Sequence, residues 1–373
     1  MAAQGPNVRL RTKLAAAVVA VVVGFGLCEV AARIIYEAPP DPAREPQLLY
    51  QADPNVGFLH VPNEQGYLDD GFATINALGL RGPLPEMPKP PGTIRVLAIG
   101  DSTTFGWGVN DRDTYVAQLE RDLSGAFPGR RIDVVNGGVG AYDLKHDARL
   151  LRHFAPMLKP DLVLVGVYWN DLPFEAVTPE GESLKGGGSE MPGGSSGNAP
   201  AKPFKIGNNP SRLNRLLRRS RLLYVLRRAW LAAITPTQAA SNTVRWEMAL
   251  LDGRHSEAID NAWRDIESTL TEIRDMGQAD GFAVGVVIIP IRAQVEEDHP
   301  HAEYQTRVRA IADALGMFVI DPLPAFLDEP PDRKRFFIPY DRIHFTAEGN
   351  KVLAGVAFDT LRARPEFREA HPQ

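Results

Sequence analysis

The sequence predicts an α/β fold: a three-layer α/β/α sandwich with a five-stranded parallel sheet and a helical insertion. Two observations support this. Several short apolar runs show no alternation of polarity, which indicates strands covered on both faces. Segments with helical periodicity separate these runs, as in a parallel sheet whose strands are joined by crossover helices. The predicted strands are residues 94–99, 131–135, 161–168, 283–290 and 317–320.

The helices between these strands are predicted from the spacing of their apolar residues. Asp113 is the expected N-cap of the first one, and Thr346 is the expected N-cap of the last one. Pro160 follows the second helix and is expected to end it. The predicted helices are residues 113–126, 144–158, 243–276, 304–315 and 347–361.

Composition limits the possible classes of protein. The chain has 373 residues, of which 44% are hydrophobic, so it can form a sizeable core. Its net charge of -5 argues against a general nucleic-acid-binding surface, which is usually basic. Cys28 is the single cysteine, so no disulfide can form within the chain.

The N-terminus carries a membrane-targeting pattern. Arg9, Arg11 and Lys13 precede an apolar run over residues 14–28, which predicts a cytoplasmic N-terminus and an external remainder of the chain. We interpret residues 1–36 as a cytoplasmic tail and an uncleaved anchor in the cytoplasmic membrane. A cleaved signal peptide, with a small-residue site at 30–32 and a secreted product, is the alternative.

Residues 37–92 contain recurring prolines and no long helical period. They are expected to connect the anchor to the main domain, either on its surface or packed against it. Within them, the passage at residues 76–82 predicts a turn in which Arg81 pairs with a surface acid.

Polar residues gather where the predicted strands end. The first strand ends in Gly100, Asp101 and Ser102, and the strand at 161–168 is followed by Asn170. In parallel sheets the carboxyl ends of strands border the binding crevice, so these side chains are expected at one edge. Near the C-terminus, Asp341 precedes His344 by three residues.

Three blocks together resemble the SGNH hydrolase superfamily, also called GDSL esterases. They are GDS at 100–102, GVYWND at 166–171 and DRIH at 341–344. The resemblance implies a flavodoxin-like strand order, 2-1-3-4-5. It places the hydrolase domain at residues 93–373, with a flexible and helical insertion at 175–278.

The catalytic residues follow from this resemblance and from the chemistry of the side chains. A serine hydroxyl needs a base, and His344 has a suitable pKa range, with Asp341 holding its imidazole. The Ser102 N–H and the Asn170 side chain are expected to stabilise the oxyanion. The family's third donor is a glycine N–H, and its position falls on Ala141; a positive φ there would penalise the methyl group, so Gly140 is a second candidate.

The predicted function is a serine esterase that hydrolyses a carboxylic ester through an acyl-enzyme outside the cytoplasmic membrane. Its expected partners are a small-molecule or glycan ester and, through the N-terminal helix, the membrane. No nucleic acid or organic cofactor is expected. No metal is expected either, because the loop at Asp298, His299 and His301 lacks a second ligand cluster. The alternatives are an O-acyltransferase or deacetylase acting on a cell-surface glycan, and an inactive glycan-binding module.

The insertion contains two different parts. Residues 180–203 are rich in Gly, Ser and Pro, which is typical of a flexible segment. Residues 210–233 predict a basic amphipathic helix, with leucines on one side and arginines on the other. Such a helix can cover a core with its leucines and expose its arginines to solvent, or it can lie on an anionic membrane surface.

Overall fold

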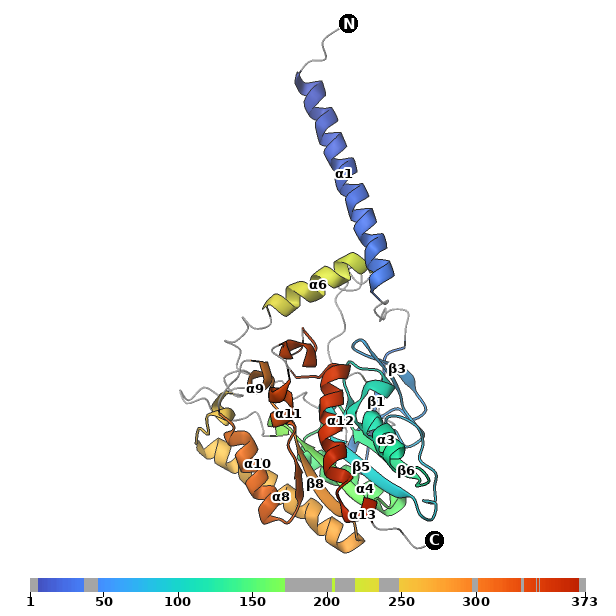
Figure 1. Ribbon diagram of the computed structural model, residues 1–373, viewed down its shortest axis with the longest axis vertical. Coiled ribbons are helices and arrows are strands. Elements are labelled where there is room, and N and C mark those ends of the chain that lie inside the picture. The colour runs from blue at the N-terminus through green and yellow to red at the C-terminus, as the bar shows by residue number, and fades with distance from the viewer. Residues whose placement is uncertain are drawn as a thin grey trace.

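A parallel sheet of five strands lies at the centre of the protein (Figure 1). The computed structural model describes residues 6–36, 46–171, 203–204, 219–234, 248–296, 301–329, 332–339, 341 and 343–368. The sheet has the order β6-β5-β7-β8-β9, which is the order 2-1-3-4-5 when its strands are numbered along the chain. The predicted strand order is therefore confirmed. Its strands are β5 (Ile94–Gly100), β6 (Ile132–Gly138), β7 (Leu162–Val167), β8 (Ala283–Ile288) and β9 (Phe318–Ile320).

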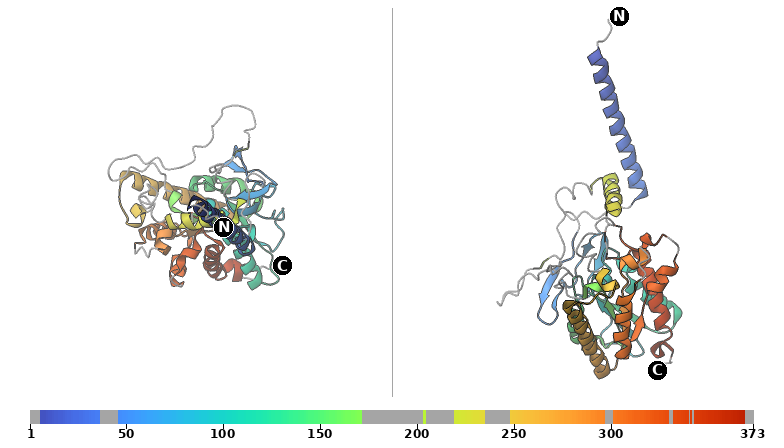
Figure 2. Two further views of the ribbon diagram at one scale, coloured as in Figure 1. Left: turned by 90° about the horizontal axis from the view of Figure 1, so that it is seen from above. Right: turned by 90° about the vertical axis from the view of Figure 1, so that its left-hand side faces the viewer.

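The central strands are buried on both faces. Every residue of β5 and β7 is buried, which explains why neither strand alternates in polarity. Helices α3 (Tyr115–Ala126) and α12 (Ala347–Leu361) pack together on one side of the sheet, and α4 (Leu144–Leu158) packs with α8 (Glu257–Asp280) on the other (Figures 1 and 2). The prediction of a three-layer sandwich is confirmed.

The described residues form further helices and turns around the sheet. They are α2 (Ser102–Phe105), α6 (Arg221–Ile234), α9 (Arg292–Glu296), α10 (Glu303–Ala314), α11 (Leu323–Asp328) and α13 (Pro365–Arg368), with 3-10 turns at Asp111–Asp113, Trp169–Asp171 and Arg333–Phe336. The Thr346 hydroxyl caps α12, as predicted, by accepting a hydrogen bond from the Gly349 N–H.

Two helix boundaries differ from the predictions. The cap of α3 is Thr114, whose hydroxyl accepts from the Ala117 N–H, because Asp113 belongs to the preceding 3-10 turn. The helix predicted at 243–276 is interrupted. Residues 248–251 are helical, Gly253 then adopts a φ of +65°, and α8 starts anew behind the N-cap Ser256. Residues 243–247 lie outside the described residues, as do 180–202, 205–218, Asp298 and His299.

An apolar helix extends away from the domain. Helix α1 (Pro6–Ile35) contains an apolar stretch of 24 residues, Thr12–Ile35, in which an 18-residue window has a mean hydropathy of 2.4 and is not buried (Figure 1). At 1.5 Å per residue this stretch is about 36 Å long, enough to cross a hydrocarbon core of about 30 Å. The length and composition fit an anchor or a signal sequence.

The connecting segment forms two hairpins that the sequence analysis did not predict. They are β1 (Tyr50–Asp53) with β2 (Gly57–His60), and β3 (Gln65–Leu68) with β4 (Gly71–Thr74). Tyr50 and Phe58 are buried, and the ring of Phe58 meets that of Tyr142 at 5.0 Å in the main domain. The segment therefore packs against the main domain.

Candidate active site

Ser102 is held at the start of a short helix by the turn that follows β5. A side chain at Gly100 would bring a Cβ within 2.4 Å of the Thr104 hydroxyl, so the turn requires glycine. The Asp101 carboxylate caps α2 by accepting a hydrogen bond of 2.8 Å from the Thr103 N–H. These contacts fix Ser102 as the first helical residue at the carboxyl edge of the sheet.

Ser102, His344 and Asp341 form a continuous chain of hydrogen bonds. The Ser102 Oγ lies 2.8 Å from His344 Nε2, and His344 Nδ1 lies 2.6 Å from Asp341 Oδ2. Ser102 directly follows β5, the first strand of the parallel sheet, whereas Asp341 and His344 lie in the loop that precedes α12. The arrangement can pass the hydroxyl proton of Ser102 to the imidazole while the carboxylate orients the ring.

The loop that carries Asp341 and His344 is fixed from two sides. Asp341 Oδ1 accepts hydrogen bonds from the N–H groups of Ile343 and His344, at 2.7 and 3.1 Å. The buried Arg292 donates to the backbone carbonyl of Asp341 and pairs with Glu296 at 2.9 Å. The imidazole of His344 also stacks on the Trp107 ring at a centroid distance of 5.5 Å.

Asn170 lies at the same edge of the sheet. It sits in the 3-10 turn after β7, and its Nδ2 donates a hydrogen bond of 2.7 Å to Asp101 Oδ2. An amide nitrogen carries two hydrogens, so one donor remains for another acceptor. The bond to Asp101 ties Asn170 directly to the turn that carries Ser102.

The loop after β6 begins beside the Ser102 turn. Gly100 pairs with Gly138 in the sheet register, and the Val139 N–H donates to the Gly100 carbonyl at 3.0 Å. Ala141 has a φ of +66°, the case in which its methyl group is unfavourable. At Gly140, a Cβ would lie 2.7 Å from the Tyr50 hydroxyl, so packing requires glycine there.

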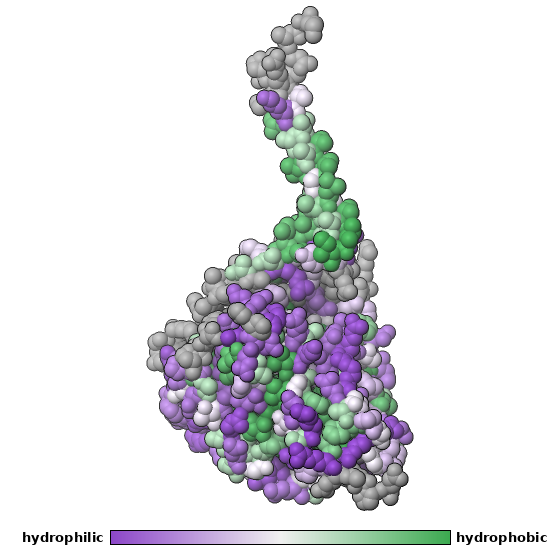
Figure 3. All heavy atoms as spheres, viewed as in Figure 1, coloured by the Kyte–Doolittle hydropathy of each residue, from purple (hydrophilic) through white to green (hydrophobic). Residues whose placement is uncertain are grey.

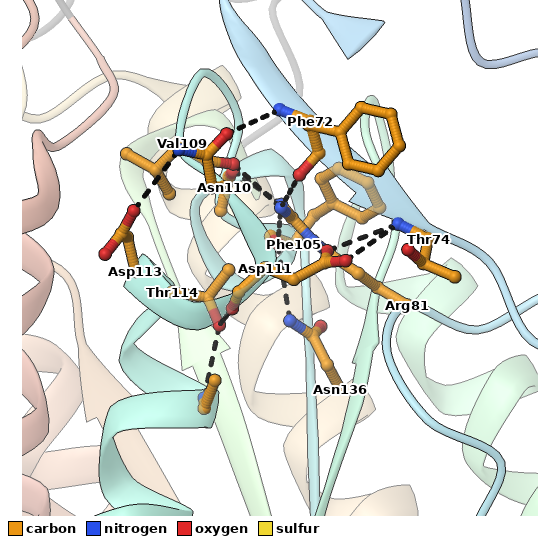
Figure 4. A network of polar contacts seen from close by, with 12 residues as sticks. Phe72, Thr74, Arg81, Phe105, Val109, Asn110, Asp111, Asp113, Thr114 and Asn136 are labelled. Atoms are coloured by element: carbon orange, nitrogen blue, oxygen red, sulfur yellow. Dashed lines mark hydrogen bonds and ion pairs between the residues drawn. The ribbon is translucent and has the colours of Figure 1, made fainter. Parts of the chain in front are cut away.

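Arg81 forms a hydrogen-bonded network around the segment that follows Ser102 (Figure 4). The sequence predicted a pair between Arg81 and a surface acid, and Arg81 Nε does donate to Asp111 at 2.8 Å. However, Arg81 is only 3% exposed, and its terminal nitrogens donate to four backbone carbonyls. These belong to Phe72, Phe105, Gly106 and Val109, at 3.1, 2.9, 2.7 and 2.7 Å.

The network supplies hydrogen-bond donors to backbone carbonyls at the end of α2. The last carbonyls of a helix lack partners within the helix, and the guanidinium group is the side chain that offers five donors. Arg81 therefore positions the C-terminal end of α2, whose first residue is Ser102. One feature of the sequence could have indicated this buried role of Arg81: the arginine stands in a largely apolar passage, residues 76–82, before the GDS block at 100–102.

A comparison of the sequence with known protein families identifies the family of this chain. Residues 98–352 match the model of the GDSL-like lipase/acylhydrolase family. The chain belongs to this family. It is an ester-hydrolysing enzyme with the SGNH hydrolase fold. No match was found among curated proteins.

Several solved structures resemble this GDSL hydrolase in outline. An alpha/beta hydrolase from the metagenome of Lake Arreo, Spain, is 18% identical, with 71% of this chain and 94% of that chain covered and a TM-score of 0.41. The lipase/acylhydrolase from Enterococcus faecalis is 14% identical, with coverages of 74% and 100% and a TM-score of 0.39. The acetylxylan esterase Axe2 from Geobacillus stearothermophilus is 15% identical, with coverages of 74% and 97% and a TM-score of 0.38.

The charges of the hydrolase site favour an ionised carboxylate beside a basic imidazole. Burial alone would raise the pKa of Asp341, but the His344 ring and the two N–H donors outweigh it and lower that pKa to about 2. Burial likewise opposes a charged His344, yet the Asp341 carboxylate raises the pKa of the imidazole above its usual value. His344 is thus a stronger base than a free histidine.

Two further buried carboxyl groups lie near the site. Burial, followed by the charge of Asp171, raises the pKa of Asp147 well above its usual range. Burial and the charge of Asp101 do the same to Asp171, although Asp171 Oδ2 accepts a hydrogen bond of 2.7 Å from the Tyr168 N–H. Both groups are held toward the neutral form, which limits the negative charge around the site.

A small pocket opens beside Asn170. Helices α4 and α8 form its walls, and the ammonium group of Lys145 meets the Asp265 carboxylate at 2.7 Å across it. The part of the chain expected to be an insertion therefore contributes α8 both to the domain core and to this pocket. The pocket is lined by Asp143, Leu144, Lys145, Asn170, Asp171, Asp265, Ile266 and Thr269.

Proposed function

We propose that this GDSL hydrolase is a serine esterase in which Ser102 is the nucleophile, His344 the general base and Asp341 the orienting carboxylate. The observation that carries the proposal is the unbroken hydrogen-bond chain from Ser102 Oγ through His344 to Asp341. This chain supplies the base that a serine hydroxyl lacks at neutral pH. It also argues against an inactive glycan-binding module.

The reaction has two halves. Ser102 Oγ attacks the ester carbonyl carbon while its proton moves to His344 Nε2. The bond between that carbon and the alcohol oxygen then breaks, and His344 returns the proton to the departing alcohol. Water next attacks the acyl carbon and gives a proton to His344, and Ser102 Oγ leaves and recovers that proton as the acid is released.

The developing oxyanion would be held by three donors. These are the Ser102 N–H, the second N–H of the Asn170 amide and the N–H of Ala141 or Gly140. Two observations support this assignment: the short bond that ties Asn170 to the Ser102 turn, and the strand register that brings the loop after Gly138 to the same turn. Removing such a donor typically costs about 3 kcal/mol of barrier lowering.

The pocket beside Asn170 supports an ester of a polar alcohol. Its lining includes the carboxylates of Asp143 and Asp265, which can accept hydrogen bonds from the hydroxyl groups of a sugar. We therefore infer a substrate such as an O-acylated glycan, processed outside the cytoplasmic membrane by a domain that α1 anchors. Transfer of the acyl group to a sugar in place of water is the second candidate, in which the same carboxylates would bind the acceptor sugar.

The deciding experiment is intact-mass analysis of the full chain in detergent after reaction with a fluorophosphonate. We expect one adduct on the wild type and none on Ser102→Ala. An unmodified, folded wild type would contradict the assignment of Ser102. Labelled protein is then compared with unlabelled protein on O-acetylated oligosaccharides, with and without an acceptor sugar, and acyl transfer faster than hydrolysis would identify a transferase.

A further inference from the structure

The end of α1 holds the start of α6. The Glu29 carboxylate of α1 accepts hydrogen bonds from the Ser220 hydroxyl at 2.7 Å and from the N–H groups of Arg221 and Leu222, both at 2.9 Å. These are the unpaired donors at the N-terminus of α6. As a result, α6 departs from the lower end of α1 and lies across the top of the domain (Figure 1).

The polar face of α6 is turned toward the protein. The Tyr224 hydroxyl bonds to Asp70 Oδ2 at 2.5 Å, and Arg228 bonds to the Tyr224 hydroxyl at 2.8 Å. Asp70 lies in the turn between β3 and β4, so these contacts dock α6 on the second hairpin. Tyr224 and Arg228 are four residues apart and thus share one face of the helix.

The opposite face of α6 is apolar and exposed. Leu226 is 54% exposed and Trp230 is 60% exposed, and the exposed Ala229 and Ala233 continue the same stripe at helical spacing. Of the two arrangements that the sequence allowed for this helix, leucines over a core or a helix on a membrane surface, the exposed Leu226 does not fit the first. A helix on the surface of a soluble protein turns its apolar stripe inward, so this one is arranged for an apolar environment outside the domain.

The exposed apolar surface of α1 extends as far along the helix as the level of α6. Leu27, Val30 and Ile34 lie on one side of α1 and are 67%, 56% and 80% exposed, so the apolar surface passes Glu29 and reaches the level of α6. The hydrophobic surface of α1 continues onto the top of the domain at this point (Figure 3). Residues 219–234 also contain four arginines and no acidic residue.

We propose that α6 lies in the surface of the bilayer that α1 spans, with Leu226 and Trp230 directed toward the acyl chains and Arg219 and Arg227 near anionic headgroups. The proposal rests on α1 remaining uncleaved. An amphipathic helix of this kind sits about 5–10 Å into the boundary between headgroups and acyl chains, and tryptophan is favoured at that depth. Two attachments, α1 and α6, then fix the orientation of the catalytic domain on the membrane.

Probes at single cysteines test this arrangement in the full chain. The native cysteine is first removed by the substitution Cys28→Ser. A single new cysteine, Leu226→Cys or Ala233→Cys, is then labelled with an NBD fluorophore on the apolar face of α6. Ser268→Cys is the matched control, because it is exposed on a helix, α8, at the other end of the domain. Each protein is reconstituted in vesicles of phosphatidylcholine with phosphatidylglycerol, with or without lipids that carry a doxyl group on the acyl chain.

We expect the doxyl lipids to quench the probes at 226 and 233 at least about twofold, and to leave the probe at 268 unchanged. Vesicles of phosphatidylcholine alone should give weaker quenching, because the arginines then lack anionic partners. Unquenched emission at water-exposed wavelengths at 226 and 233 would overturn the proposal. So would blue-shifted emission without quenching, which would indicate that another protein surface covers α6.

The same samples separate this result from the enzymatic proposal. Fluorophosphonate labelling of Ser102 is measured on each reconstituted variant, and positions 226, 233 and 268 lie outside the proposed active site. Normal labelling with unquenched probes would reject the membrane-surface helix alone. Quenched probes without labelling would reject the esterase alone.

Discussion

At the scale of single residues, Asn170 is the most direct test of the oxyanion site. We expect Asn170→Ala to lower kcat by about two orders of magnitude, because the transition state loses a donor that it needs more than the bound substrate does. Steady-state kinetics on an aryl acetate measures this effect. The thermal unfolding of the variant serves as the control for folding, and an unchanged kcat would remove Asn170 from the site.

Ala141 offers a second test, because its φ of +66° is costly for a residue with a Cβ. We expect Ala141→Gly to keep or raise activity and to increase the free energy of unfolding by up to about 1 kcal/mol, measured by urea denaturation. Gly140→Ala is the opposing control, since its Cβ would meet the Tyr50 hydroxyl at 2.7 Å. A large loss of activity in Ala141→Gly would mean that the methyl group is needed for packing.

The raised pKa of His344 predicts the pH dependence of the enzyme. His344 acts as a base only when neutral, so activity is lost as the pH falls through its pKa, which Asp341 holds above the usual 6.5. We expect a kcat/KM profile whose acid limb has its midpoint above pH 6.5. In Asp341→Asn the acid limb of the remaining activity should move to lower pH. An acid limb at the same pH as in the wild type would contradict the effect of Asp341 on the pKa of His344.

The residues that the sequence revealed are those whose chemistry is distinctive. Ser102, Asn170, Asp341 and His344 follow strands or belong to short blocks, and the structure brings them to one edge of the sheet. The ion pair of Arg81 with an acid was predicted, but its burial beside the Ser102 turn was not, because most of its partners are backbone carbonyls. Any sequence supplies such acceptors, so no pairing of side chains along the chain points to them.

At the scale of elements, Arg81 connects the second hairpin to the helix of Ser102. We expect Arg81→Lys to reduce the free energy of unfolding by about 3 kcal/mol, because an ammonium group cannot replace five directed donors and several buried carbonyls lose their partner. If Arg81 also positions Ser102, kcat should fall in Arg81→Lys while KM changes little. Arg112→Ala is the control, since this nearby arginine is largely exposed.

The elements themselves were predictable where burial imposes a clear pattern. The strands of the parallel sheet are continuous apolar runs, so their existence and order of appearance could be predicted from the sequence. The hairpins at 50–60 and 65–74 have strands of four residues each, too short for a periodic signal. The orientation of α6 was not predictable, because it depends on contacts with Glu29 and Asp70, far away in the sequence.

At the scale of the whole molecule, the protein combines a catalytic domain with an apolar helix, and Glu29 is the link between them. Three donors at the start of α6 end on this one carboxylate, which lies on the N-terminal side of the possible cleavage site at 30–32. Cleavage there would remove Glu29 and leave those donors unpaired. This contact favours an anchor that is retained over a signal peptide that is removed.

The contact between Glu29 and the start of α6 also predicts how firmly α1 holds the first turn of α6. In the full chain, Glu29→Gln should weaken the cap by about 1–2 kcal/mol, because a neutral amide interacts less favourably with the helix N-terminus than a carboxylate does. We expect hydrogen exchange at Arg221 and Leu222 to become roughly tenfold faster, since exchange follows the free energy of local opening. Glu267→Gln, on the exposed surface of α8, should leave these amides unchanged. Equal exchange in wild type and Glu29→Gln would show that α6 is held by its contacts with the second hairpin alone.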